Sequence, residues 1–201
     1  MNISTIDVDK VKELLDSYWK KWEPYSQGEL TRNYIHIAKE DFLYRVNLYN
    51  DFIKRKDLSH FYPFRTIFET LVKFEYLLNL GSSEREKWLC LDILYCYEQI
   101  SKNEPNEDKE LNQIIQLVKK NYTDKKVERR INIECEINKS KIFEKSDYNI
   151  YRVLSSYDHS FLLAPVLLNE YGGKDNDIFT HNTLDIIMVA LEKLIEIKMQ
   201  Y

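Results

Sequence analysis

The sequence has very little glycine and proline, with four of each among 201 residues. An average protein has about 12% of these two residues together. Sheets joined by tight turns need many of them, because their corners require backbone angles that glycine and proline favour. The sequence therefore argues against sandwiches, barrels and propellers. The shortage of glycine also excludes a phosphate-binding glycine loop, and neither G-x-x-x-x-G-K-[ST] nor G-x-G-x-x-G occurs.

Cysteines, metal-binding motifs and long apolar runs are scarce or absent as well. There are three cysteines and no C-x-x-C, which is typical of a reducing compartment. No H-E-x-x-H or Glu-x-x-His occurs, so we expect no metal and no cofactor. The N-terminus does not resemble a signal peptide, and no apolar run reaches the roughly 20 residues of a membrane span. We therefore expect a cytoplasmic protein that does not enter the membrane.

Apolar residues make up 44% of the chain and recur at helical spacing. The pattern predicts helices over 8–22, 30–56, 61–80, from Ser83 (a capping box with Glu86), from Asn106, over 124–141, from Ser146 into the 160s, and over 182–199. We expect an all-α fold, an irregular bundle of seven or eight helices, in one domain covering 1–201. Residues 1–28 would form an N-terminal helix that packs on the bundle. Pro165 should bend or end the helix before it.

Arg65 and Glu69 carry charge inside an otherwise apolar helix. Four residues apart, they share one face of that helix. If this face is interior, each charge needs a partner, because an unpaired buried ion costs several kcal/mol. One interpretation is a structural ion pair between helices, and the other is part of a site. His60 and His181 lie near predicted helix starts, where we expect them to face water.

Arg152 and His159 are a second pair in apolar surroundings. They are seven residues apart, so both point to the same side of a helix, with Ser155 between them. A histidine beside a guanidinium suits phosphodiester cleavage, because histidine can move a proton and arginine can offset charge on the phosphate. The alternative is a buried histidine hydrogen-bonded to a carboxylate such as Glu69, with Ser155 as a satisfied polar residue.

These two segments resemble a bacterial all-helical family of domains of unknown function, marked by an R-x-x-x-E helix and a later Y-x-x-x-S-x-x-x-H helix. Arg152 with six residues before His159 also resembles the R-x(4–6)-H signature of HEPN domains. That superfamily includes dimeric, metal-independent ribonucleases of toxin–antitoxin and phage-defence systems. The resemblance implies that His159 is the general acid or base and that Arg152 stabilises the phosphorane. Arg65, Glu69 and Ser155 would then orient these two residues.

One stretch of the chain is strongly basic. Six basic residues fall within twelve positions, with Tyr122 among them: Lys119, Lys120, Lys125, Lys126, Arg129 and Arg130. Basic side chains around an aromatic can hold a single strand through phosphate contacts and stacking. The same composition is also typical of a solvated helix end.

Two hypotheses follow. The first is a HEPN-like protein of a bacterial defence system that acts on RNA through Arg152 and His159, forms a homodimer, and pairs with an antitoxin or another protein. The second is a non-catalytic helical interaction module, in which Arg65, Glu69, Arg152 and His159 form a buried polar cluster. Convergence of these four side chains with access to water would favour the first hypothesis, and convergence in a sealed core the second.

Overall fold

The computed structural model describes residues 5–22, 29–55, 60–81, 84–85, 87–92, 112–113, 116, 131–159 and 175–198. Six helices have defined bounds: α1 (Val8–Lys20), α2 (Glu29–Lys54), α3 (Phe61–Asn79), α6 (Ile133–Ile137), α7 (Lys145–His159) and α9 (Asp175–Glu196). No strand occurs within those ranges, and the predicted all-α class is confirmed. The part of the chain between 84 and 92 is also helical wherever it is described.

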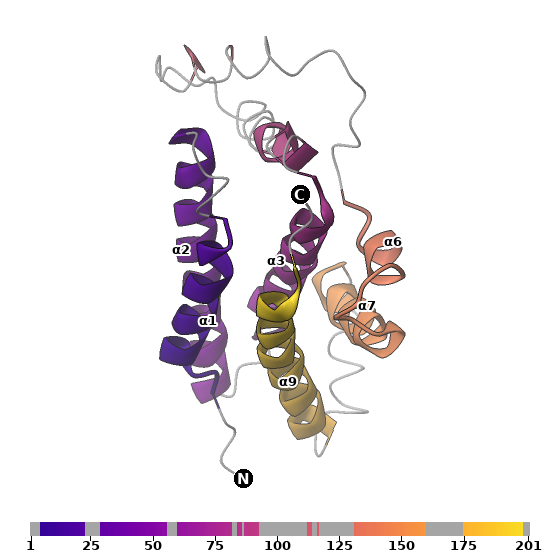
Figure 1. The fold of residues 1–201 in the computed structure, drawn as a ribbon. Coiled ribbons are helices and arrows are strands. Elements are labelled where there is room, and N and C mark those ends of the chain that lie inside the picture. The colour runs from indigo at the N-terminus through magenta and orange to yellow at the C-terminus, as the bar shows by residue number, and fades with distance from the viewer. Residues whose placement is uncertain are drawn as a thin grey trace.

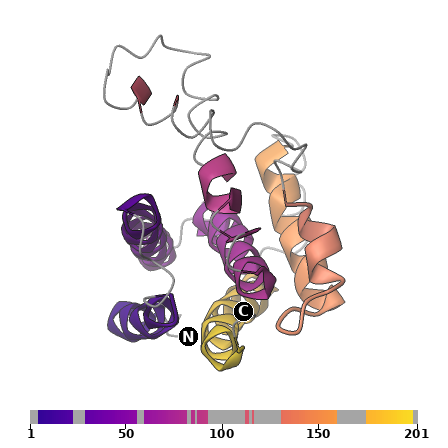
Figure 2. The ribbon, with the colours of Figure 1, turned by 45° about the horizontal axis from the view of Figure 1, so that its top comes forward.

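Helix α3 lies at the centre of the arrangement. Helices α1 and α2 lie on one side of it, α6 and α7 on the other, and α9 packs against both α3 and α1 (Figures 1 and 2). Eleven of the 19 residues of α3 are buried. A helix that is apolar on most sides must be covered on most sides, which is why neighbours surround α3. Helix α1 contacts both α2 and α9.

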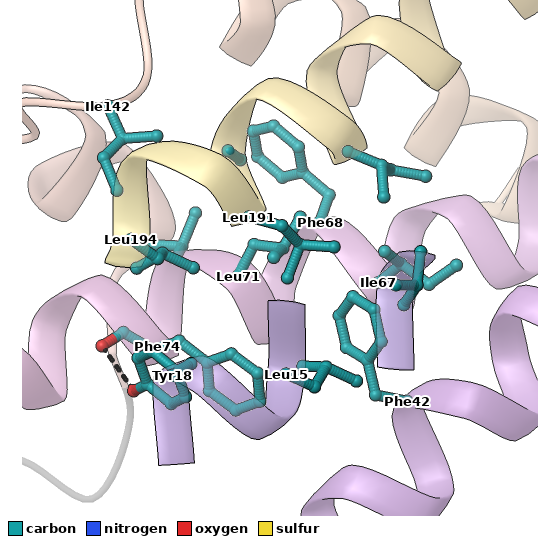
Figure 3. Packing of buried hydrophobic residues seen from close by; sticks show 14 of the residues in the cluster. Leu15, Tyr18, Phe42, Ile67, Phe68, Leu71, Phe74, Ile142, Leu191 and Leu194 are labelled. Carbon is teal, nitrogen blue, oxygen red and sulfur yellow. Dashed lines mark hydrogen bonds between the residues drawn. The ribbon is translucent and has the colours of Figure 1, made fainter. Parts of the chain in front are cut away.

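The hydrophobic core is built mainly from α1, α2, α3 and α9. Leu15, Phe42 and Leu191 meet the inner face of α3 in this core, and each is at most 1% exposed (Figure 3). Tyr18 stacks on Phe74 with 4.9 Å between ring centroids, and its hydroxyl donates to the Phe74 carbonyl oxygen at 2.9 Å. The buried phenol is therefore satisfied by a backbone acceptor, as a polar group in a core requires.

Side-chain caps mark the N-terminal ends of α1 and α6. The start of α1 at Val8 agrees with the prediction, and the Asp7 carboxylate accepts the backbone N–H groups of Asp9 and Lys10 there. Asn132 caps α6 in the same way by accepting from Cys135 N. These side chains accept backbone N–H groups that have no partner in the first turn of a helix.

Three boundaries differ from the sequence prediction. Helix α7 begins at Lys145 and is not capped by Ser146; instead Asp147 Oδ2 accepts the Glu144 N–H at 2.8 Å. Helix α9 begins at Asp175, seven residues before the predicted start. Within 131–141 the described helix is the five-residue α6. The predicted caps at Ser83 and Asn106 and the bend at Pro165 lie outside the described residues.

His60 corrects a further expectation. It precedes α3 and is 3% exposed, so it does not face water. Its ring lies between Tyr49, at 5.6 Å, and Phe61, at 4.1 Å, measured between ring centroids. The side chain of His181, which falls inside α9, is outside the described part. None of the helices in the described ranges is both long enough and apolar enough to cross a bilayer.

Candidate functional site

A single carboxylate oxygen joins α3 to α7. Glu69 Oε1 accepts the Nε–H of Arg65 at 3.0 Å and the hydroxyl of Tyr151 at 2.7 Å. Arg65 and Glu69 lie four residues apart on α3, as the sequence predicted, whereas Tyr151 comes from α7, 82 residues after Glu69. We call Arg65, Glu69 and Tyr151 the α3–α7 polar cluster.

Aromatic packing brings Tyr151 to this carboxylate. Its ring stacks on Phe68 with 5.1 Å between centroids and 19° between planes, and Phe68 in turn lies 5.0 Å from Phe143. Phe68 is fully buried and adjacent to Glu69 in the chain. Stacking on Phe68 therefore carries the Tyr151 hydroxyl to Glu69, and the apolar and polar contacts of α7 support each other.

The cluster is partly exposed to water. The side chains of Arg65 and Glu69 are 27% and 30% exposed. A pair at this exposure gains little from charge attraction alone, because water screens it. The hydrogen bond from Tyr151 adds a second donor to Glu69 and links two helices that are far apart in the chain.

The surroundings of Tyr151 raise the pKa of its phenol. Burial is the largest cause, followed by the hydrogen bond to Glu69 and the negative charge of that carboxylate, while Ser155 and Arg65 act in the opposite direction. The phenol therefore keeps its proton at neutral pH and acts as a donor. The Ser155 oxygen is buried close by.

Arg152 does not join the α3–α7 polar cluster. Its side chain is exposed. Burial and the hydrogen bond to Glu134 raise the pKa of the Tyr148 phenol, and the positive charge of Arg152 acts against that rise. Tyr148 donates to Glu134 Oε2 of α6 at 3.2 Å. The buried four-residue cluster of the second hypothesis is therefore wrong for Arg152, because its side chain is exposed and shares a face of α7 with Tyr148, four residues before it.

Two other predicted sites fall wholly or partly outside the described residues. His159 is the last residue of α7, and its side chain is not described. The six basic residues from Lys119 to Arg130 also lie outside the described ranges. The structure thus brings Arg65 and Glu69 together, with Ser155 close to Tyr151, and it keeps Arg152 apart from them.

The sequence pattern gave no role to Tyr151 or to Glu75. Tyr151 is the first residue of the Y-x-x-x-S motif, and its position four residues before Ser155 was the available signal. Glu75 is 3% exposed inside the most apolar helix and binds Ser140 and Lys141 of the α6–α7 connection. An acid placed directly between Phe74 and Tyr76 in a largely apolar helix was the signal for Glu75.

The chemistry available to the α3–α7 polar cluster is limited by its hydrogen bonds. Glu69 Oε1 accepts both of these hydrogen bonds, so the three side chains of the cluster are engaged with one another. No group of three or more potential metal ligands occurs in the ranges that the structure describes.

A scan against protein-family models, a search of curated proteins and a search of solved structures each found no match for this chain.

Proposed function

We propose that this protein is a non-catalytic helical interaction module in which the α3–α7 polar cluster fixes helix α7 and presents its outer face to a partner protein. The observation that carries the proposal is the double hydrogen bond to Glu69 Oε1, from Arg65 at 3.0 Å and from Tyr151 at 2.7 Å. A carboxylate held in this way ties α7 to α3 and fixes the orientation of α7. The outer face includes exposed Arg152 and Val153, the latter 40% exposed.

Two measurements test this proposal: the free energy of unfolding of variants in α7, and the cleavage of RNA by the purified protein. We expect Tyr151→Phe to lower the free energy of unfolding by about 1 kcal/mol, since it removes one hydrogen bond to a carboxylate. Arg152→Ala, at an exposed position on the same helix, is the matched control and should change stability by less than about 0.5 kcal/mol. Purified wild-type protein should leave single-stranded RNA intact. RNA cleavage that Arg152→Ala abolishes would contradict the module.

A second candidate is a metal-independent, HEPN-like ribonuclease that is cytoplasmic, dimeric and paired with an antitoxin. The exposure of Arg152 favours it, together with the continuous helix from Arg152 to His159. Seven residues span about 10 Å along a helix and return to the same side, so both side chains could reach one phosphodiester. His159 would move the proton, Arg152 would offset charge on the phosphate, and the basic residues from Lys119 to Arg130 would hold the strand.

The nuclease has its own test. In such a reaction the 2′-hydroxyl gives its proton to a base and attacks phosphorus, and the 5′-oxygen leaves with a proton. We expect Arg152→Ala and His159→Ala each to slow cleavage by about 100-fold or more if they have these roles. Lys145→Ala, at an exposed position at the start of α7, should cleave like wild type. Equal cleavage in all four proteins would indicate a contaminating nuclease and rule out this candidate.

A further inference from the structure

A pocket lies between the start of α7 and the outer face of α9. Its volume is about 280 Å³, and its walls come from Ile142, Phe143, Glu144 and Asp147 and from α9 between Asp185 and Lys193. Ile142, at one wall, lies beside α9 (Figure 3). Pockets for drug-sized ligands measure about 300–1,000 Å³, so this one suits a small molecule or a single side chain. We call it the α7–α9 pocket.

Much of the pocket lining is apolar. Ile142, Phe143 and Ala190 are at most 5% exposed, and Ile186 and Val189 of α9 complete the apolar lining. Val189 is 43% exposed, one of the large hydrophobic side chains left open to solvent. A ligand with an aliphatic stem would cover Val189 and remove apolar surface from water.

The charged residues of the pocket are mostly acidic. The lining contains three acidic residues and one cation, which gives an excess of two negative charges: Glu144, Asp147, Asp185 and Lys193. Lys193 Nζ donates to the Ile142 carbonyl oxygen at 3.4 Å, and Asp147 Oδ2 accepts the Glu144 N–H at the start of α7. Glu144 and Asp185 form no ion pair within the part of the chain that the structure describes. These two carboxylates are therefore available to a ligand.

We propose that the α7–α9 pocket binds an organic cation with an aliphatic stem, an alkylammonium group. The stem would lie on Val189 and Ile186, and the ammonium would meet Asp185 and Glu144 at the rim. The combination selects this class, because an anion would be repelled and a neutral hydrocarbon would leave the charges without a partner. A metal ion fits less well, since the described carboxylates do not gather into a group that could hold one.

Amine probes of matched shape test the pocket directly. We expect n-pentylammonium to bind in the millimolar range, as a ligand of few atoms does, and to shift the NMR signals of Val189 and Ile186. n-Pentanol has the same stem without the charge, and pentanoate has the opposite charge; both should bind at least about five-fold more weakly. Pentanol binding as tightly as the ammonium would overturn the proposal, and so would the absence of shifts at these residues.

Asp185→Asn gives the residue-level test. This exposed residue carries one of the two available carboxylates, and its loss should weaken n-pentylammonium binding by about five-fold. Asp51→Asn on α2 is exposed, lies outside the pocket and removes the same charge, so it should bind like wild type. Equal weakening in both variants would mean that the amine responds to net charge, and it would overturn the pocket as the site.

The same chemistry could come from a free amine or from a lysine side chain of another protein. Titration with acetyl-Ala-Lys-Ala-amide separates the two sources, because its ammonium stem is identical and its backbone must also fit the pocket rim. Shifts at Val189 with both probes indicate a lysine-bearing partner, and shifts with pentylammonium alone indicate a free amine. Either result supports the cation pocket, and shifts with neither would overturn it.

Discussion

The hydroxyl of Ser140 donates a 2.5 Å hydrogen bond to Oε2 of Glu75, a carboxylate that is 3% exposed inside α3. The N–H of Lys141 donates to the other oxygen, Oε1, at 2.7 Å. Ser140 Oγ also accepts the N–H groups of Ile142 and Phe143, at 2.9 and 2.7 Å. One buried acid thereby fixes the connection between α6 and α7, and the short distances are typical of charge-assisted bonds.

Glu75→Gln should weaken this connection. The amide loses the charge and turns a donor toward a Ser140 oxygen that already accepts two hydrogen bonds, so we expect a loss of about 2 kcal/mol in the free energy of unfolding. Urea denaturation followed by circular dichroism measures the change. Glu40→Gln, at an exposed position on α2, is the control and should cost less than about 0.5 kcal/mol. Equal costs at the two positions would contradict this assignment.

Tyr49 should make the protein sensitive to alkali. Burial raises the pKa of its phenol to about 12, while its hydrogen bond with Thr183, 2.8 Å between oxygens, acts against that rise. An unfolded chain releases this proton near pH 10, and the folded protein holds it until about pH 12. Stability therefore falls as pH rises through this window, by about 3 kcal/mol from this residue.

Tyr49→Phe tests the alkaline effect. The variant should lose about 1 kcal/mol at neutral pH through the missing hydrogen bond, and its stability should fall less steeply between pH 10 and 12 than that of wild type. Some slope should persist, because burial also raises the pKa values of Tyr18 and Tyr151. Tyr44→Phe, at a position 64% exposed on the same helix, should retain the wild-type slope. An unchanged slope in Tyr49→Phe would show that another group dominates.

Lys21 caps the C-terminal end of α9 from the other end of the chain. Its ammonium donates to the carbonyl oxygens of Leu194, at 3.1 Å, and Ile197, at 2.7 Å. These carbonyls have no partner within the helix, and a cation there also suits the helix dipole. Partial burial lowers the pKa of Lys21, so part of this gain is offset by desolvation.

Lys21→Met should therefore cost about 1 kcal/mol of stability. Lys12→Met, at an exposed position on α1, removes the same charge without touching α9 and should be close to neutral. Hydrogen exchange at the last turn of α9 should accelerate only in the first variant. Matching exchange rates in the two variants would argue against the cap.

Arg85 should not tolerate lysine. Its guanidinium lies 5.1 Å from the centroid of the Trp22 ring and donates to the carbonyl oxygens of Leu77 and Leu80 at the end of α3. Lysine cannot form this planar fork, so Arg85→Lys should cost about 2 kcal/mol and alter Trp22 fluorescence. Arg45→Lys, in an exposed pair with Asp41, should cost less than about 0.5 kcal/mol. Wild-type stability in Arg85→Lys would show that the hydrogen bonds of Arg85 to the Leu77 and Leu80 carbonyl oxygens contribute little to stability.

The sequence predicted helices where apolar spacing was continuous. The starts of α1, α2 and α3 agree with it to within one residue, because each carries a long stripe of large side chains. The first turns of α9, Asp-Asn-Asp-Ile-Phe-Thr-His, lack such a stripe, and the start at Asp175 was missed for that reason. The Ser146 cap failed because the Asp147 carboxylate reaches the free N–H of Glu144 instead.

The sequence predicts polar contacts within one helix but not those between helices. Spacing within one helix shows that Arg65 and Glu69 share a face, and the structure confirms their ion pair. The pairing of Glu69 with Tyr151, or of Glu75 with Ser140, depends on which helices become neighbours. A one-dimensional pattern does not contain that information, because packing of the whole core selects the neighbours.

The attachment of α6 and α7 has a consequence for motion. Their main contacts are with α3 and with each other, and the two acids that hold them, Glu69 and Glu75, lie less than two turns apart on α3. Residues 131–159 can therefore open as one local unfolding unit while α1, α2, α3 and α9 keep their shared core. Amide protons across this segment should exchange with one common opening rate, well before those of α3.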